Sequence, residues 1–176
     1  MRLPIPSMHG VTTERLVFRH TSMDDRSWWM EYINSADAIR FMPFTVGSEQ
    51  DCAFFIQRSL DRYATDGSGL NAIIEQATGR PIGMIGLLVQ VVDDMGELEV
   101  GYHLLPSAWG KGYASEAAIA CKEFAKEHHC AASVISLIDH ENFASQAVAK
   151  RNGMTYEKDT VHRGVPAMVW RVSFTS

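Results

Sequence analysis

Few cysteines, no excess of positive charge and no long apolar run set the first limits on this sequence. Its three cysteines, Cys52, Cys121 and Cys130, are scattered and odd in number within 176 residues. This usage favours reduced thiols over a disulfide framework and predicts a cytoplasmic location. No run approaches the ~20 apolar residues of a membrane span, and the amino-terminal stretch lacks the apolar centre of a signal peptide. We therefore expect no membrane partner.

The charge balance is acidic, with a formal net charge of −5 at pH 7. A general nucleic-acid binder needs a basic stripe, so we expect no direct binding to nucleic acid. The run His128, His129, Cys130 invites a metal interpretation. Adjacent helical residues point apart, however, and no other Cys/His cluster lies at ligand spacing, so we expect no metal. The length and the ordinary composition predict one domain over residues 1–176.

The stretch from Glu97 to Ala118 organises the rest of the chain. Its first eight residues alternate between apolar and polar, which predicts a strand, and the proline that follows ends it. Gly110 and Gly112 allow positive φ angles and close approach of a ligand. A helix is expected to begin at Tyr113 or Ala114, with its free amides and positive dipole end facing this loop. Such a strand-loop-helix is an anion site, and phosphate is the obvious anion.

Short alternating segments joined by tight turns predict a sheet around this strand. Residues 70–75 and 82–92 lead into it as an antiparallel meander, and residues 132–138 are rich in β-branched residues and form a further strand. Asn142 is placed to cap a helix whose buried face includes Phe143. Residues 1–12 are interpreted as a loose leader.

Three separated motifs carry a resemblance to one family. T-E-R-L-V-F-R-H, from Thr13 to His20, is an alternating edge strand; W-G-K-G-Y-A-S-E-A begins at Trp109; and N-x-x-S at Asn142 is followed by R-N-G-M at Arg151. In this order they resemble the GNAT N-acetyltransferases, in particular the ribosomal-protein (RimJ/RimL-like) branch. Trp109 stands where the general acetyl-CoA loop, Gln/Arg-x-x-G-x-Gly/Ala, has Gln or Arg, which leaves the backbone cradle intact.

The resemblance implies the GNAT fold: α/β (α+β), with a mixed, mostly antiparallel sheet of six to seven strands and helices on both faces. It implies a gap where the central strand meets strand 132–138, with acetyl-CoA as co-substrate. The expected acetyl acceptor is a primary amine, on a protein N-terminus or a small molecule, and the expected assembly is a monomer or homodimer. The implied cofactor contacts are Leu104, Leu105, Trp109, Gly110, Lys111, Gly112, Tyr113, Ala114, Asn142 and Ser145.

Direct transfer requires a base for the amine and a proton for the departing thiolate. Glu99 on the central strand is the first candidate for the base, against the alternative of a solvent-exposed strand carboxylate. His103 has a suitable ordinary pKa near 6.5 but could instead fill the cleft wall, and His162 is a third candidate. Ala149 stands where many members have a tyrosine that acts as acid, so Ser145 becomes the candidate donor, although a first-turn serine can simply satisfy backbone.

Two other functions compete with the acetyltransferase interpretation. A non-catalytic acyl-CoA-binding or sensing module on the same fold would keep the loop without turnover, and the residue at Ala149 leaves this open. A dinucleotide binder is disfavoured, because the loop is only a partial G-x-G-x-x-G and follows a meander strand. The acceptor side is expected from residues 28–42 and 161–166, with one of Trp28 and Trp29 in the core and the other lining the substrate cleft.

Overall fold

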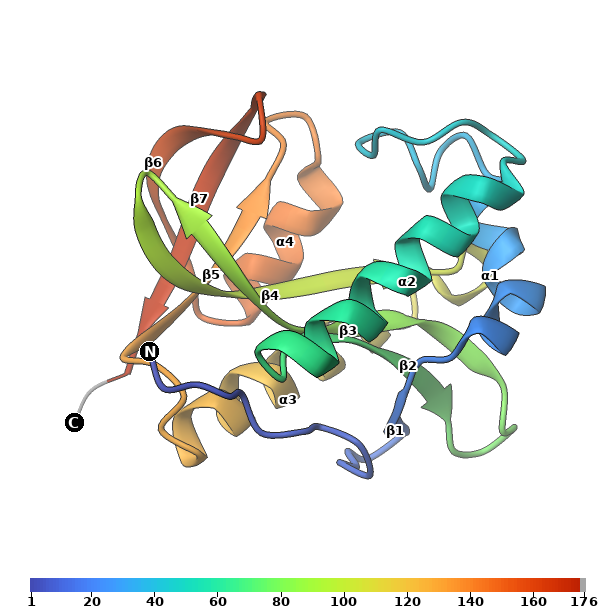
Figure 1. Cartoon of the computed structure of the whole chain (residues 1–176), viewed down its shortest axis with the longest axis horizontal. Helices are drawn as coiled ribbons and strands as arrows, with labels where there is room; N and C mark the ends of the chain where they lie inside the picture. Colours follow the sequence, from blue (N-terminus) through green and yellow to red (C-terminus); the bar gives the residue numbers. More distant parts are fainter. Residues whose placement is uncertain (175–176) are drawn as a thin grey trace.

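Seven strands form one sheet in the order β1-β2-β3-β4-β5-β7-β6, in a computed structural model that describes residues 1–174 (Figure 1). Only β4 and β5 run parallel; every other neighbouring pair is antiparallel. The expected mixed, mostly antiparallel sheet is confirmed. The strands are β1 Leu16–His20, β2 Gly69–Glu75, β3 Pro81–Val92, β4 Met95–Leu104, β5 Ser133–Ile138, β6 Thr155–His162 and β7 Val165–Ser173. The main helices are α1 Arg26–Ile33, α2 Glu49–Thr65, α3 Tyr113–Glu127 and α4 Phe143–Arg151.

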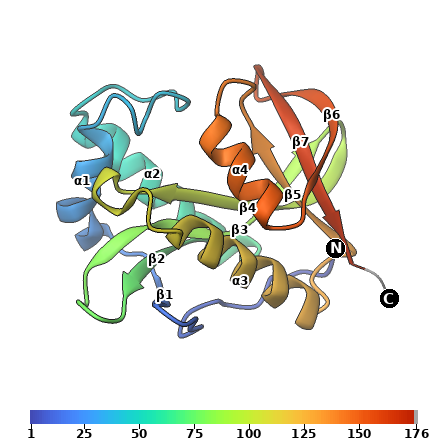
Figure 2. The same cartoon turned by 180° about the vertical axis from the view of Figure 1, so that it is seen from behind.

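Helices cover both faces of this sheet, as expected. Figure 1 shows α2 in front of β3 and β4 with α1 beside α2, and Figure 2, from behind, shows α3 and α4 on the other face. Two separate apolar clusters hold these layers together. The first joins α1 and α2 to the sheet through Trp29, Ile33, Phe55, Ile56 and Met84. The second joins α3 and α4 to the sheet and includes Leu98, Val100, Ala117, Cys121 and Val148.

The β3–β4 hairpin fixes which backbone groups of the central strand are free. Asp93 and Asp94 have φ of 49° and 61°, the left-handed values of a two-residue type I′ turn. Pairing then runs without a register shift along β4, so its odd-numbered residues hydrogen-bond to β3 and its even-numbered amides point the other way. The Leu105 N–H agrees with this alternation, because it donates to the Ile82 carbonyl at 2.9 Å.

Two expectations about the edges of the fold are wrong. The leader is packed against the body: Ile5 and Met8 are only 3% exposed, and the Ile5 N–H donates to the Asp66 carbonyl at 2.8 Å. Its apolar side chains thus complete the larger core. Phe143 is 73% exposed rather than buried, because the buried Val148 lies five residues on and therefore on the far side of the helix.

Within residues 1–174, no helix is long and apolar enough to cross a membrane. The same part of the chain contains no group of three or more side chains arranged to hold a metal ion.

Candidate active site

The sheet opens between its two parallel strands. β4 and β5 pair at one position, Glu99 with Ile135, and diverge beyond it, which is the gap expected from the sequence. At the fork, Ser136 Oγ donates to the Val100 carbonyl at 2.8 Å. By the alternation along β4, the amides of Tyr102 and Leu104 point into the opening rather than at β3. Unpaired strand amides at such an edge can bind an extended, amide-containing ligand.

The glycine loop lies at the end of this opening. Gly110 and Gly112 have φ of 74° and 80°, and Gly112 is the N-cap of α3 without any side chain that caps the helix. The first-turn amides therefore remain available to a ligand. Open space lies beside Gly110, where an added Cβ would meet nothing within 4 Å. This geometry has the features of a phosphate cradle at a helix N-terminus.

The motif that begins at Thr13 packs against the glycine loop, a contact that the sequence did not reveal. Arg15 Nη1 donates to the Lys111 carbonyl at 2.9 Å, and Nε donates to Glu116 Oε2 at 2.6 Å. Thr13 Oγ1 donates to Glu116 Oε1 at 2.5 Å, and the Arg15 guanidinium lies 4.3 Å from the Tyr113 ring centre. Thr13, Arg15 and Glu116 form what we call the loop clamp, and it fixes the glycine loop against the edge of the sheet.

The expected cofactor contacts differ in what they present to a ligand. Trp109 is 46% exposed and its Nε1 donates to the Leu104 carbonyl at 3.1 Å, so the indole covers the end of the strand. The Tyr113 ring is buried and its hydroxyl is bonded to Glu75, which leaves only its backbone for the loop. Leu105 is buried in the α1–α2 cluster and its N–H is used by β3, so of the two leucines only Leu104 offers a free amide.

Glu99 lies on the α1–α2 face of the sheet and is 9% exposed, which excludes the solvent-exposed alternative. Its Oε2 accepts a hydrogen bond of 2.7 Å from Gln90 Nε2. Burial raises the pKa of this carboxyl above its usual value, although the Gln90 bond and the nearby Arg62 and Arg163 oppose the shift. A carboxylate with a raised pKa is a stronger base than an ordinary one.

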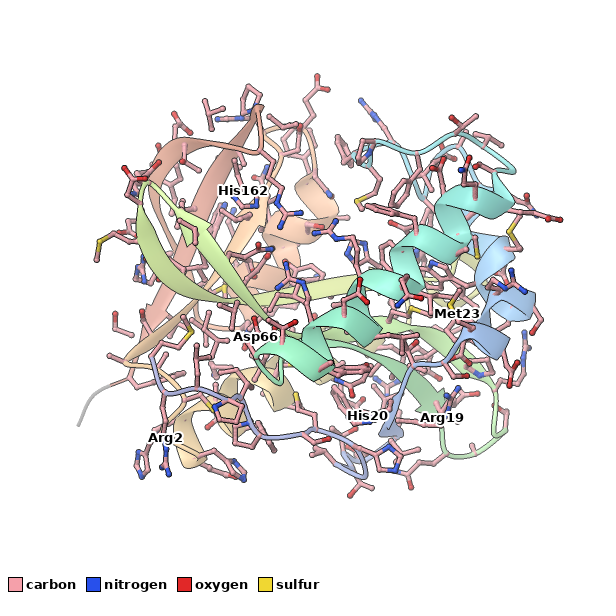
Figure 3. The ribbon with its side chains drawn as sticks, in the orientation of Figure 1. Arg2, Arg19, His20, Met23, Asp66 and His162 are labelled. Atoms are coloured by element: carbon pink, nitrogen blue, oxygen red, sulfur yellow. The ribbon has the colours of Figure 1, made fainter. Side chains whose placement is uncertain are left out.

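His103 lies on the same face of the sheet as Glu99, but its pKa is shifted in the opposite direction. Its Nδ1 lies 3.0 Å from the Tyr32 hydroxyl, and the Phe55 ring packs edge-on against it. Burial, with a smaller contribution from Arg58, lowers the pKa of His103 to about 4. The ring is therefore neutral at physiological pH and a weak base. Burial also lowers the pKa of His162, which lies at the end of β6 (Figure 3).

On the other face, α4 begins beside the opening. The Ser145 N–H donates to Asn142 Oδ1 at 3.1 Å, so Asn142 makes the ordinary N-cap bond. Tyr102 Oη donates to the Ser145 carbonyl at 2.7 Å and thereby spans the space between β4 and α4. Sequence reasoning missed Tyr102, and the signal that points to it is the lack of a tyrosine at Ala149, which directs attention to other hydroxyls near α4.

The two segments expected to form the acceptor side, residues 28–42 and 161–166, lie on the α1–α2 face or next to it. Trp29 is fully buried and Trp28 partly so, and Trp28 Nε1 donates to Asp25 Oδ1 at 2.8 Å. The two rings meet edge to face, with their centres 5.5 Å apart. The loop after α1 reaches the β5–α4 loop, where Arg40 Nη2 lies 3.4 Å from Glu141 Oε2.

Comparison with known sequences and structures agrees with this geometry. Residues 15–155 match the sequence profile of the Acetyltransferase (GNAT) domain. The uncharacterized protein YkkB of Bacillus subtilis is 36% identical over 84 residues, 48% of this chain, and the match spans about half (49%) of that protein. The uncharacterized N-acetyltransferase YnaD of B. subtilis is 28% identical, with 85% of this chain and 84% of YnaD covered.

Solved structures share the whole architecture. An acetyltransferase from Agrobacterium tumefaciens superposes with a TM-score of 0.79 at 26% identity, over 99% of this chain and 98% of that one. RimL, a ribosomal L7/L12 alpha-N-protein acetyltransferase in complex with coenzyme A, superposes with a TM-score of 0.70 at 17% identity, over 92% and 96% of the chains. The sequence profile covers most of the chain, and these structures share its fold: the chain belongs to the GNAT acetyltransferase family.

Proposed function

We propose that this enzyme transfers the acetyl group of acetyl-CoA to a primary amine, by direct attack within a ternary complex. The observation that carries the proposal is the opening between β4 and β5, which has the uncapped start of α3 at one end and Glu99 at the point where the strands part. When bound, acetyl-CoA supplies an activated acetyl thioester. The chain's residues hold it, remove a proton from the amine and return a proton to the thiolate.

The binding residues act mainly through their backbone. The amides between Gly110 and Ala114 hold the pyrophosphate at the positive end of α3, with Lys111 as a counter-charge on the loop. The amides of Tyr102 and Leu104 hold the amide-containing arm and polarise the thioester carbonyl, which is the role of preorganised donors in acyl transfer.

Glu99 is the proposed general base, acting directly or through one water. Its environment strengthens it as a base, whereas that of His103 weakens the imidazole. We assign His103 to the wall of the acceptor site, held by Tyr32. An α-amino group has a pKa of about 7.7–8.0, against about 10.4 for lysine, so a protein N-terminus would need less help from Glu99 than a side-chain amine.

The proton for the departing thiolate comes from a hydroxyl near the start of α4. Ser145 and Tyr102 are joined through the hydrogen bond between the Tyr102 hydroxyl and the Ser145 carbonyl. Burial raises the pKa of Tyr102, so the phenol carries its proton at neutral pH. We propose that one of these two hydroxyls replaces the tyrosine that Ala149 lacks.

Direct transfer is supported by the state of the cysteines. All three are buried, and burial raises the pKa of each, including Cys121 on the packed side of α3. None is therefore an activated thiolate able to accept the acetyl group. The protein's membership of an acetyltransferase family also leaves no observation that favours a non-catalytic sensing module.

The proposal is tested by incubating the protein with acetyl-CoA and a panel of amines: N-terminal peptides, free amino acids, polyamines and amine-bearing antibiotics. Release of free thiol, with acetylated amine confirmed by mass spectrometry, is the expected result for at least one class. Thiol release equal to the background hydrolysis rate for every amine would contradict it.

A further inference from the structure

We propose that the acceptor amine carries an anionic group, a carboxylate or a phosphate, and that Arg58, Arg62 and Arg163 bind this group beside Glu99. The inference rests on the proposed acetyl transfer and names the chemical class of its acceptor. We call these three residues the arginine cluster. They come from two parts of the chain, α2 and the turn between β6 and β7, on the same face of the sheet as the proposed base.

Gln90 is the centre of the arginine cluster. Its Oε1 accepts hydrogen bonds from Arg62 Nη2 at 3.3 Å and from Arg163 Nη2 at 3.4 Å, while its Nε2 donates to Glu99 at 2.7 Å. Two guanidinium groups thus share one neutral amide oxygen, and the same Gln90 side chain is hydrogen-bonded to the proposed base. Arg58 completes the cluster, since it lies one helical turn before Arg62 on α2, and the charges of Arg62, Arg163 and Glu99 all act on its pKa.

The cluster lacks matching negative charge. Among residues 1–174, the ion pairs formed by arginine involve Arg15, Arg19, Arg40 and Arg171, and none involves a member of the cluster. The nearby carboxyls are Glu99, whose own pKa is raised by burial, and Asp66 beside Arg62. Burial and the mutual repulsion of the three cations lower the pKa of Arg58 and of Arg62.

The conformation of Arg163 is a second, independent observation. It has φ of 51° in a two-residue hairpin turn, followed by Gly164 at 78°. Asparagine, aspartate or glycine is favoured at that first position, and arginine is uncommon there. The turn nevertheless directs an arginine to Gln90. A protein with net charge −5 thus places a third positive charge beside Gln90 from a backbone conformation that arginine rarely adopts.

Arginine is suited to the ligand that we infer. Its five donors bind carboxylate and phosphate in a planar, bidentate manner. Arg62 is already oriented by a 2.7 Å bond from Nη1 to the Val89 carbonyl, and its remaining donors, like those of Arg163, are available. An anion bound here would hold the acceptor next to Glu99, so that the amine and the proposed base lie in one site.

The test compares acceptors that differ only in the anion. Phosphoethanolamine is paired with ethanolamine, and peptides beginning with Asp or Glu are paired with their Asn or Gln counterparts. The variants are Arg163→Gln, which is exposed and so leaves the fold intact, and Arg58→Gln. Arg2→Gln is the matched control, because Arg2 lies at the lower edge of the molecule in Figure 3, away from His162 and its hairpin.

We expect the wild type to prefer the anionic member of at least one pair by about tenfold or more in kcat/KM, as one charge-assisted hydrogen bond contributes. Arg163→Gln and Arg58→Gln should remove this preference through KM for the anionic acceptor, with acetyl-CoA affinity unchanged. Equal kcat/KM within every pair would overturn the inference and leave the acetyl transfer itself standing.

Calorimetry separates the two proposals if no acceptor in the panel is acetylated. Phosphoethanolamine and an aspartyl peptide are titrated into the protein in the presence of CoA. Binding that Arg163→Gln weakens and Arg2→Gln does not supports the anion site, and the carboxylate and phosphate arms identify which anion it takes. Binding that is absent, or that is equal in wild type and Arg163→Gln, contradicts it.

Discussion

Arg15 is not itself a proposed cofactor contact, and replacing it with glutamine should loosen the glycine loop. The substitution removes the Arg15 bonds to Glu116 at 2.6 Å and to the Lys111 carbonyl at 2.9 Å. Because the Arg15 side chain is 40% exposed, solvent screening limits the ion pair to about 1 kcal/mol or less. The bond to the carbonyl adds about 1 kcal/mol.

The expected total of about 2 kcal/mol can appear in two measurable ways. If the loop loosens, ordering it on binding costs that free energy, and the Kd for acetyl-CoA rises by up to about 30-fold. The melting temperature should fall by a few degrees, as expected for about 1 kcal/mol or more in a domain of this size. Isothermal calorimetry and thermal denaturation measure the two effects, with Arg2→Gln as the exposed control.

A second variant, at the Arg15 partner Glu116, makes this test more specific. Burial alone would raise the pKa of Glu116, but hydrogen bonds from Thr13 and Arg15 outweigh it and hold that pKa below its usual value. The double variant with Glu116→Gln should therefore lose less than the sum of the single variants. Unchanged acetyl-CoA affinity in a folded, destabilised Arg15→Gln protein would refute the idea that the loop clamp prepares the cofactor site.

The remaining predictions address the loop, the base and the acid. Gly112→Asp places a side chain and a negative charge where φ is 80°, so acetyl-CoA binding measured by calorimetry should fall at least tenfold; wild-type affinity in the folded variant would remove this loop from the site. Glu99→Gln should lower kcat about 100-fold and flatten the limb of the pH–rate profile that reports the raised pKa of Glu99. Since a carboxyl with a raised folded pKa loses stability as pH rises through that pKa, the same variant should melt no lower than wild type at pH 8, and a lower melting temperature would indicate a structural role. Tyr102→Phe and Ser145→Ala should each leave acetyl-CoA affinity nearly unchanged, and the one that supplies the proton should lower kcat; if both keep wild-type kcat, neither hydroxyl supplies it.

The sequence predicted the strands and helices around the site because their signals are local. Alternation in β4, two glycines before a helix and Asn142 ahead of α4 each depend on neighbouring residues, and the structure agrees at all of them, with Asn142 accepting a bond from the Ser145 amide. The gap between β4 and β5 also followed from the resemblance. Phe143 was misplaced because a single aromatic residue at a helix start carries little information on which side faces the core.

The arrangement of side chains at the site depended on contacts between distant segments, which no local pattern encodes. Arg15 and Glu116 are 101 residues apart in sequence, and Arg163 is 73 residues from Gln90. The burial of Glu99 likewise depends on how β3, β5 and α2 pack around β4. Sequence alone could therefore nominate Glu99 as a base but could not decide between an exposed and a buried carboxylate.

The measurement that tests the central claim most directly is the initial rate of thiol release over a grid of acetyl-CoA and amine concentrations. Direct attack in a ternary complex predicts double-reciprocal lines that intersect, and no acetylated protein when acetyl-CoA is supplied without amine. Parallel lines, together with an acetyl-cysteine found by mass spectrometry in the absence of amine, would contradict the account and establish a covalent intermediate.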